Sequence, residues 1–206
     1  MREEPHFAEF TAQLRACIAC DGLPLGHNPL FQLHPEARVL IAGQAPGRIT
    51  HQKGRPFDDP SGDRLRDWLG IDKTRFYTSR SLAMLPMGLC FPGSGKSGDL
   101  PPRAECAIRW RAETLARMPK IELTLVFGRY AIDWHLPALR GASVTQAVTA
   151  WRDTWPRILA LPHPSPRNNR WLAKNPWVER EIIPALRARV AELLPSQPLV
   201  AKAAPH

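Results

Sequence analysis

The chain has 206 residues, 44% of them hydrophobic, which is enough to bury one substantial core and predicts a single domain. Its 28 lysines and arginines outnumber its 19 acidic residues, and the resulting formal net charge of +9 favours a polyanionic partner. No stretch approaches the ~20 consecutive apolar residues of a membrane span, and the first residues lack the pattern of a signal peptide. We therefore expect a cytoplasmic protein that does not bind a membrane.

Helix and strand patterns alternate along the first half of the chain. Apolar side chains recur at helical spacing near the start, at Phe7, Phe10, Leu14 and Cys17. Residues 38–42 form a short apolar run that predicts a strand, and residues 82–87 predict a second one. Between them, residues 61–69 predict a helix that Ser61 caps and Gly70 ends.

The second half continues the same alternation. The predicted elements are a helix entered through two prolines (104–118), a strong strand (121–127), a helix (130–136), a strand (158–161) and a final helix that begins at Asn175 or Pro176 and reaches Leu194. Pro184 lies inside the final helix and is expected to kink it.

Strands that alternate with helices indicate an α/β fold. We predict three α/β/α layers around a central, mainly parallel four-stranded sheet with helices on both faces. The single domain is expected to span residues 1–195, followed by a flexible tail over residues 196–206.

A histidine and a rigid turn follow the strand predicted at 158–161. Residues 163–169 have the sequence His-Pro-Ser-Pro-Arg-Asn-Asn, in which the two prolines fix the backbone. The carboxyl ends of strands are where open α/β sheets hold their chemistry, so His163 is a candidate catalytic residue. Arg167 and the two asparagines offer hydrogen-bond donors to phosphate or base edges. The alternative is a proline-rich surface turn without a function.

A second candidate motif follows the strand predicted at 38–42. Its sequence is Gly43-Gln44-Ala45-Pro46-Gly47, and Gly54-Arg55-Pro56-Phe57 comes shortly after it. Glycines let a backbone approach a flat ligand closely, and the side chain of Gln44 offers an amide. Phe57 is a candidate stacking platform. Each motif by itself is equally compatible with a structural turn and a core phenylalanine.

The spacing of the four cysteines favours a metal site. Two form a C-x-x-C pair, and the other two lie on either side of a loop rich in proline and glycine, at Cys17, Cys20, Cys90 and Cys106. In a cytoplasmic protein this pattern indicates metal ligands before disulfides. Thiolates suit iron-sulfur clusters and tetrahedral zinc alike, so the spacing leaves both open. Ordinary buried thiols are a further alternative.

Taken together, these residues resemble the uracil-DNA glycosylase superfamily over residues 17–177. Residues 43–47 resemble its first motif, 54–57 its aromatic loop and 163–168 its second motif. The first motif is closest to the iron-sulfur family 4 enzymes, which have glutamate at the position of Gln44. The second motif is more similar to the single-strand-selective monofunctional type.

The resemblance implies a monofunctional DNA repair glycosylase. Such an enzyme hydrolyses the N-glycosidic bond of uracil in DNA and leaves an abasic site, and we expect it to act as a monomer on uracil-containing DNA. The resemblance also favours a [4Fe-4S] cluster over zinc, with a structural role and with one close and one distant pair of ligands: Cys17, Cys20, Cys90 and Cys106.

The same resemblance implies roles for individual residues. His163 would donate a hydrogen bond to the uracil O2 as the base leaves, and Phe57 would stack on the extruded base. Gln44 would act in catalysis and, with the rest of the first motif, shape the pocket and hold the attacking water: Gly43, Ala45, Pro46 and Gly47. DNA contact would fall to the residues after the histidine, with Arg167 a candidate to fill the space that the base vacates: Ser165, Arg167, Asn168, Asn169 and Arg170.

Two positions depart from the family pattern. A more efficient branch has an aspartate at the position of Ala45 that orients the water, so we expect a slower enzyme or reliance on another group. Asp58 and Asp59 are candidate substitutes, although a solvated turn is the favoured interpretation. Residues 85–88, Leu-Pro-Met-Gly, lack the asparagine that commonly recognises the uracil edge, which extends the expected substrates to other deaminated bases.

A glycine-rich segment at 93–97 is a misleading motif. Its sequence Gly-Ser-Gly-Lys-Ser is similar to a nucleotide-binding P-loop, but that pattern requires a glycine where this chain has Cys90. We interpret the segment as flexible and basic, near the DNA or the cluster.

Two other classes of function remain open. A non-catalytic or very slow binder of uracil-containing or damaged DNA would keep the basic surface and the pocket without turnover. A hydrolase that acts on RNA or nucleotides is a weaker alternative, because it rests on analogy of fold.

Overall fold

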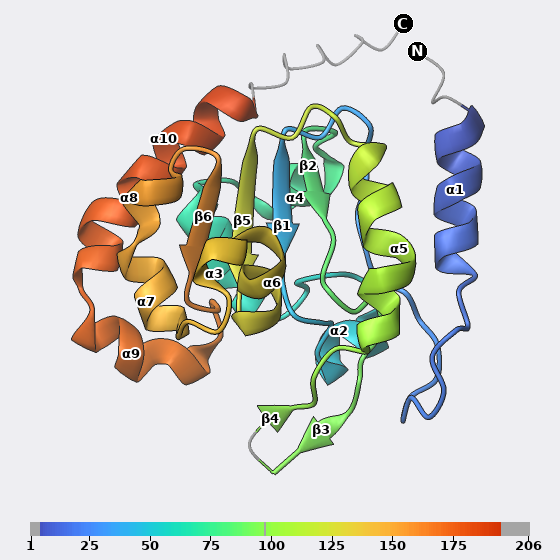
Figure 1. Cartoon of the computed structure of the whole chain (residues 1–206). Coiled ribbons are helices and arrows are strands. Elements are labelled where there is room, and N and C mark those ends of the chain that lie inside the picture. Colours follow the sequence, from blue (N-terminus) through green and yellow to red (C-terminus); the bar gives the residue numbers. More distant parts are fainter. Residues whose placement is uncertain (1–4, 97, 195–206) are drawn as a thin grey trace, which may run out of the picture.

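The fold is built around a parallel sheet. The structure is a computed structural model that describes residues 5–96 and 98–194, and within them one sheet has four parallel strands in the order β2-β1-β5-β6 (Figure 1). These strands are β1 (Val39–Ala42), β2 (Leu82–Met84), β5 (Leu123–Phe127) and β6 (Ile158–Leu161). Their side chains are almost all buried, as expected when helices cover both faces of a parallel sheet. The predicted α/β class and four-stranded sheet are confirmed.

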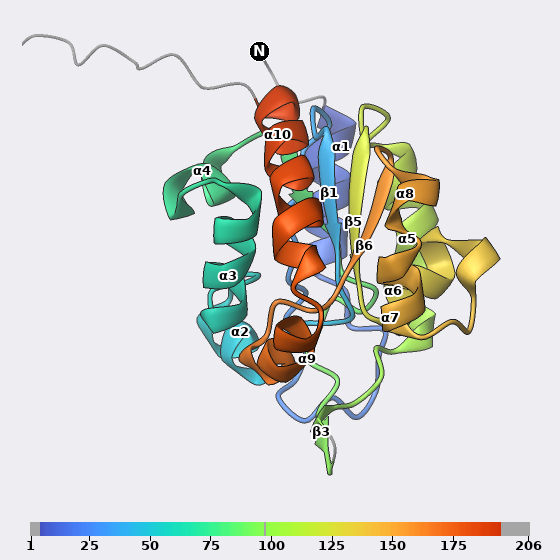
Figure 2. The same cartoon turned by 90° about the vertical axis from the view of Figure 1, so that its left-hand side faces the viewer.

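Helices form the two outer layers (Figure 2). One side carries α2 (Arg48–Lys53), α3 (Pro60–Leu69), α4 (Lys73–Thr78), α9 (Asn169–Lys174) and α10 (Ile183–Leu193). The other side carries α1 (Pro5–Arg15), α5 (Ala104–Ala116), α6 (Arg129–His135), α7 (Val144–Thr149) and α8 (Trp151–Thr154). Short 3₁₀ segments cover Pro137–Leu139 and Pro166–Asn168. A small antiparallel hairpin pairs β3 (Ser94–Gly95) with β4 (Gly98–Asp99).

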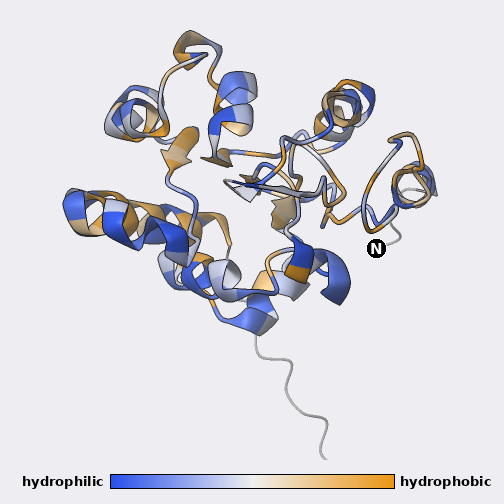
Figure 3. Cartoon of the chain, turned by 90° about the horizontal axis from the view of Figure 1, so that it is seen from below, coloured by the Kyte–Doolittle hydropathy of each residue, from blue (hydrophilic) through white to orange (hydrophobic). Residues whose placement is uncertain are grey.

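The buried apolar side chains form two groups, and the larger one includes residues from helices on both sides of the sheet, such as Leu65 of α3 and Ile132 of α6. Val39 and Ile41 pack in the larger group, with the apolar sides of α3 and α10, whereas Leu40 packs in the smaller group with residues of α1 and α5. This division follows from the alternation of side chains along a strand. Figure 3 views the molecule along the sheet and shows hydrophobic strands inside and hydrophilic residues on the outer sides of the helices. No helix in the described part of the chain combines the length and hydropathy that crossing a membrane requires.

Two predicted helix ends are wrong. Ser61 does not cap α3: the helix begins at Pro60, and the carboxylate of Asp59 accepts a hydrogen bond from the backbone N–H of Gly62 at 2.9 Å. Gly70 ends this helix in the left-handed conformation, as predicted. The first helix ends at Arg15, so Cys17 lies in the loop after it.

The last predicted helix is divided rather than continuous from residue 175. A π-helical turn covers Val178–Ile182, and α10 follows from Ile183. Pro184 lies in the first turn of α10, where the missing N–H costs little. The irregularity therefore falls in the turn before the proline. The predicted tail at 196–206 lies outside the described residues.

A buried cation joins α5 to the loop after β2. The side chain of Arg111 is 2% exposed and donates hydrogen bonds to the backbone carbonyls of Leu85 (3.0 Å) and Pro86 (3.1 Å) and to His135 Nε2 (2.5 Å). Burial lowers the pKa of Arg111 to about 10, which keeps it charged at neutral pH. Burial, together with the charge of Arg111, lowers the pKa of His135 to about 3. His135 is therefore a neutral acceptor, and Arg111 holds the backbone of residues 85–86.

His135 makes the stability of the fold depend on pH. Below pH 6.5 the unfolded chain protonates this histidine but the folded chain does not until about pH 3, so stability falls as pH decreases. His135→Gln keeps an acceptor for Arg111 and removes the proton site. In denaturant unfolding from pH 6.5 to 4, we expect the free energy of unfolding of the wild type to fall more steeply than that of the variant, by a difference approaching about 1.4 kcal/mol per pH unit. The exposed His6→Gln serves as control, and equal slopes for wild type and His135→Gln would contradict the prediction.

Candidate functional site

The candidate site lies at the edge of the sheet where the parallel strands end. Residues 43–47 follow β1, residues 85–88 follow β2, and His163 follows β6 after one residue. Pairing of β1 and β2 continues beyond the strands, because the N–H of Met87 donates to the carbonyl of Gly43 (2.8 Å) and that of Gly88 to Gln44 (2.9 Å). The chain passes from β1 to β2 on one side of it and then to β5 on the other, and open α/β sheets bind ligands at such a switch point.

Gln44 connects the first motif to the segment after the β3–β4 hairpin. Its side-chain amide donates to the carbonyl of Leu100 at 3.0 Å, and its Oε1 lies beside Gly128, at the end of β5. Gly47 directly precedes α2, with an ordinary φ of −77°. The first motif therefore spans the middle of the sheet edge.

The predicted aromatic loop places Phe57 against the first motif. The ring atom Cζ lies 3.9 Å from the position that a Cβ on Gly43 would occupy, and the ring packs edge-on against Phe76 at 6.4 Å between centroids. The backbone of Phe57 has φ of 54°, which is unusual for a bulky side chain. Its carbonyl accepts a hydrogen bond from Arg66 (3.2 Å) and lies tightly against Gly62. These contacts hold the ring in place.

The two aspartates after Phe57 have structural partners. Asp58 accepts hydrogen bonds from Lys73 (2.8 Å) and Arg55 (2.9 Å), and these two cations hold the pKa of its carboxyl well below the ordinary value. Asp59 caps α3. Both contacts agree with the structural turn that the sequence favours over a catalytic role.

One ring nitrogen of His163 accepts a hydrogen bond from the backbone. Its Nδ1 accepts a hydrogen bond from the backbone N–H of Ser165 at 3.2 Å, and its carbonyl accepts one from the side chain of Asn168 at 2.7 Å. The ring also packs edge-on against Phe127, 6.2 Å between centroids. Because Nδ1 is an acceptor, the neutral ring carries its proton on Nε2.

The surroundings of His163 keep it neutral. Burial lowers the pKa of the imidazole, and the charge of Arg167 lowers it further, against the opposite effects of Asp59 and Asp99. At neutral pH the residue is thus an uncharged donor at Nε2.

Hydrogen bonds of its own residues and of Arg64 stabilise the turn after His163. Arg64 donates to the carbonyl of Ser165 (3.2 Å) and to the side chain of Asn169 (2.6 Å), and the hydroxyl of Ser165 accepts from the N–H of Arg167 (3.2 Å). The side chains of Ser165, Asn168 and Asn169 therefore help to build the turn. Arg167 and Arg170 are exposed. DNA contact by these five residues stays a prediction.

The β3–β4 hairpin completes the site and was missed from the sequence, which predicted only a flexible segment. Figure 1 shows it at the end of the molecule toward which the strands point. The side chain of Arg167 approaches Gly98, with its Nη1 3.3 Å from the position that a Cβ on Gly98 would occupy, and Asp99 lies beside Gly47. The hairpin thus touches both motifs. A glycine-rich turn with a single carboxylate is a weak signal, and the similarity to a P-loop obscured it.

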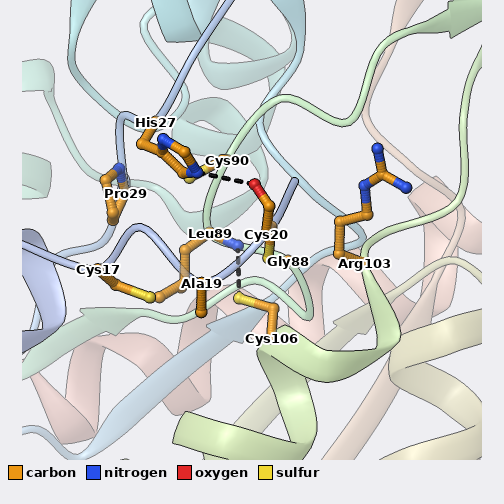
Figure 4. Close-up of a pocket in the computed structure, with 10 residues that line it drawn as sticks. All are labelled: Cys17, Ala19, Cys20, His27, Pro29, Gly88, Leu89, Cys90, Arg103 and Cys106. Carbon is orange, nitrogen blue, oxygen red and sulfur yellow. Dashed lines mark hydrogen bonds between the residues drawn. The ribbon is translucent and has the colours of Figure 1, made fainter. Parts of the chain in front are cut away.

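The four cysteines line one pocket of about 330 Å³, its open mouth included (Figure 4). They come from three distant segments: the loop after α1 (Cys17 and Cys20), the loop after β2 (Cys90) and the first turn of α5 (Cys106). All four are free thiols. The structure therefore brings together the residues that the sequence predicted as ligands. Among the described residues, no three histidine, cysteine or acidic side chains surround a single ion position.

Hydrogen-bond donors and burial surround the sulfurs. The N–H of Leu89 lies 3.4 Å from Cys106 Sγ, and the indole N–H of Trp110 lies 3.1 Å from Cys17 Sγ. Burial raises the pKa of Cys106 to about 12 and also raises the pKa values of Cys20 and Cys90. The N–H donors to sulfur and four thiols that line one pocket, two of them buried and two partly buried, fit the residues that hold an iron-sulfur cluster.

Comparison with known proteins identifies a family. Residues 31–187 match the model of the uracil DNA glycosylase superfamily; Cys17 and Cys20 precede the matched region. Among solved structures, the chain is similar to a solution NMR structure of a Methanosarcina acetivorans protein that is provisionally described as a uracil DNA glycosylase. The two are 20% identical, the match covers 79% of this chain and 94% of that one, and the TM-score is 0.48.

The support under Phe57 can be tested at Gly62. An alanine Cβ there would lie 1.7 Å from the carbonyl oxygen of Phe57, so the loop must move. We expect Gly62→Ala to lower the free energy of unfolding by about 1–3 kcal/mol, measured by denaturant unfolding. Gly47→Ala is the control for stability, because its Cβ would make only ordinary contacts. Unchanged stability of Gly62→Ala would contradict this account of the loop.

Proposed function

This chain belongs to the uracil-DNA glycosylase superfamily, and we propose that it is a monofunctional DNA glycosylase that removes uracil from DNA and leaves an abasic site. The observation that carries the proposal is the state of His163. Its neutral imidazole accepts a hydrogen bond at Nδ1 and therefore offers a single N–H, at Nε2. This N–H lies at the edge of the sheet where the first motif and Phe57 also lie. Hydrolysis of an N-glycosidic bond needs such a fixed donor where the base gains negative charge.

The proposed reaction is hydrolysis of an extruded nucleotide. The uracil leaves the base stack and lies against the ring of Phe57. Water oxygen bonds to C1′ of the sugar and the water releases one proton, while the bond from C1′ to N1 of the base breaks with its electron pair going to the base. His163 donates a hydrogen bond from Nε2 to the uracil O2 and so stabilises the departing anion. The neutral ring keeps its proton through this step.

We propose that the positively charged residues of the protein bind DNA. The formal net charge of +9 attracts the phosphate backbone, and exposed Arg167 and Arg170 follow the proposed catalytic histidine. We propose that uracil-containing DNA is the partner and that the protein acts on it as a monomer.

Recognition of the base rests on few groups. In the loop after β2, the carbonyls of Leu85 and Pro86 accept from Arg111, and the N–H groups of Met87 and Gly88 donate to the first motif. These engaged backbone groups, and the lack of an asparagine there, leave Oε1 of Gln44 as the candidate to contact the base edge, because Nε2 of the same side chain donates to Leu100. We therefore propose that other deaminated bases are also substrates.

We further propose that the four cysteines hold a [4Fe-4S] cluster. Support comes from their common pocket, their free thiols and the N–H donors to Cys17 and Cys106. Bound there, the cluster would be structural and would tie the loop after α1 to α5 and to the loop after β2. It takes no part in the bond cleavage proposed above.

Excision of uracil tests the proposed reaction. Pure protein is incubated with an end-labelled, uracil-bearing oligonucleotide, and alkali then cleaves the strand at abasic sites. We expect scission by the wild type and a loss of about 10²–10³-fold in rate for His163→Ala, the size of effect of removing one donor to a developing anion. His6→Ala, an exposed change in α1, is the matched control and should keep the wild-type rate.

Other outcomes separate the alternatives. Tight binding to uracil-bearing DNA without scission would favour a non-catalytic binder, and cleavage confined to RNA would favour the other hydrolase class. Parallel oligonucleotides with hypoxanthine or xanthine measure the range of bases. An unchanged rate in His163→Ala would overturn the role of the histidine even if uracil is excised.

The cluster has a separate test. We expect anaerobically purified protein to be brown, with iron and acid-labile sulfide in equal amounts, and Cys106→Ala to lose both. The variant should also unfold at a lower temperature, because metal binding contributes to folding free energy. Ala19→Ser changes another residue of the same pocket and should keep the iron. Protein that contains zinc, or no metal, would refute the cluster.

A further inference from the structure

Asp99 is a carboxylate at the site with one oxygen anchored. In the hairpin it pairs with Ser94, whose hydroxyl donates to Asp99 Oδ1 at 3.1 Å. The other oxygen, Oδ2, lies 3.6 Å from the position that a Cβ on Gly47 would occupy. The absence of a side chain at Gly47 thus leaves Oδ2 directly beside the backbone of the first motif.

The hairpin holds this carboxylate in position between the two motifs. Directly before Asp99, Gly98 lies against the guanidinium of Arg167. Directly after it, the N–H of Leu100 donates to the carbonyl of Gly93 (2.8 Å), and its carbonyl accepts from Gln44 (3.0 Å). Asp99 is therefore fixed on both sides, and because it is exposed, water reaches it.

Asp99 also acts electrostatically on the imidazole of the second motif. Its charge is among those that act on the pKa of His163, together with the charge of Asp59. Asp59 is engaged as the cap of α3, and Asp58 is bound by Lys73 and Arg55. Of these three carboxylates, Asp99 is the one that lies beside the first motif and is anchored through a single oxygen.

Hydrolysis requires a group that orients water and accepts its proton. The first motif supplies no carboxylate, because position 45 is alanine. We propose that Asp99 is a catalytic residue whose Oδ2 holds the attacking water beside Gly47. This inference rests on the proposed glycosylase function. As the water oxygen bonds to C1′ and the base departs with the electron pair of the broken bond, the water proton passes to Oδ2 and later to solvent.

Single-turnover kinetics on uracil-bearing DNA test this role. We expect Asp99→Asn to lower the rate of bond cleavage by about 10²-fold, as for loss of a general base. Binding to an oligonucleotide with uncleavable 2′-fluoro-deoxyuridine should be unchanged or tighter, because the variant loses a negative charge. Asp153→Asn, an exposed change of the same charge in α8, should keep the wild-type cleavage rate.

Two further variants separate chemistry from folding. Asp99→Ala should regain activity when formate is added, because formate supplies a carboxylate, whereas formate should not alter Asp153→Ala. Ser94→Ala removes the anchor of Oδ1 and leaves the carboxylate, so we expect a smaller loss, of about 10-fold, without weaker DNA binding.

The outcomes distinguish this proposal from the one it rests on. If the wild type excises uracil and Asp99→Asn cleaves at the same rate, the role of Asp99 is wrong and the glycosylase function stands. If Asp99→Asn loses binding and cleavage together and formate does not restore the activity of Asp99→Ala, the residue is structural and the proposal fails. If the wild type excises no base, both proposals fall.

Discussion

The site depends on the parallel pairing of β1 with a strand on each side. Because β1 pairs with β2 and β5, its carboxyl end opens between them, and two backbone hydrogen bonds extend the β1–β2 pairing into the loops at Gly43 and Gln44. These two bonds hold the first motif to the loop after β2. Every other part of the site is placed relative to it: the ring of Phe57, the segment at 85–88 and the hairpin.

Contacts from the helices on the two faces of the sheet hold the loops at this edge in place. On one side, Arg111 passes from α5 to the carbonyls of the loop after β2, so a buried charge is stabilised by backbone dipoles and a neutral histidine. The same loop carries Cys90, and the same helix carries Cys106. The cysteine pocket and the candidate active site therefore share a wall. A group bound by the thiols would stiffen the loop that borders the proposed base pocket.

On the other side, the aromatic loop keeps Phe57 in an unfavourable backbone conformation. The hydrogen bond from Arg66 to the carbonyl of Phe57 and the close packing of Gly62 against that carbonyl hold Phe57 in this conformation. Strained residues persist where the surroundings determine them strongly, and they gather at functional sites. Together with the proline-rich turn around His163, this gives a site whose aromatic surface and hydrogen-bond donor are both set before a ligand arrives. Such preorganisation is what stabilising a leaving group requires.

The sequence by itself determined the fold class, the four strands of the parallel sheet, both motifs and the four cysteines, because apolar periodicity, glycine stops and motif order are local properties of the chain. It did not determine the short helices α2, α4, α7 and α8, whose amphipathic patterns span too few residues, nor the cap of α3. Only the tertiary structure brought Cys90 and Cys106 into the pocket of Cys17 and Cys20, assigned the proton of His163 to Nε2 and placed Asp99 beside Gly47. These depend on contacts between distant segments and on burial, which no local pattern records.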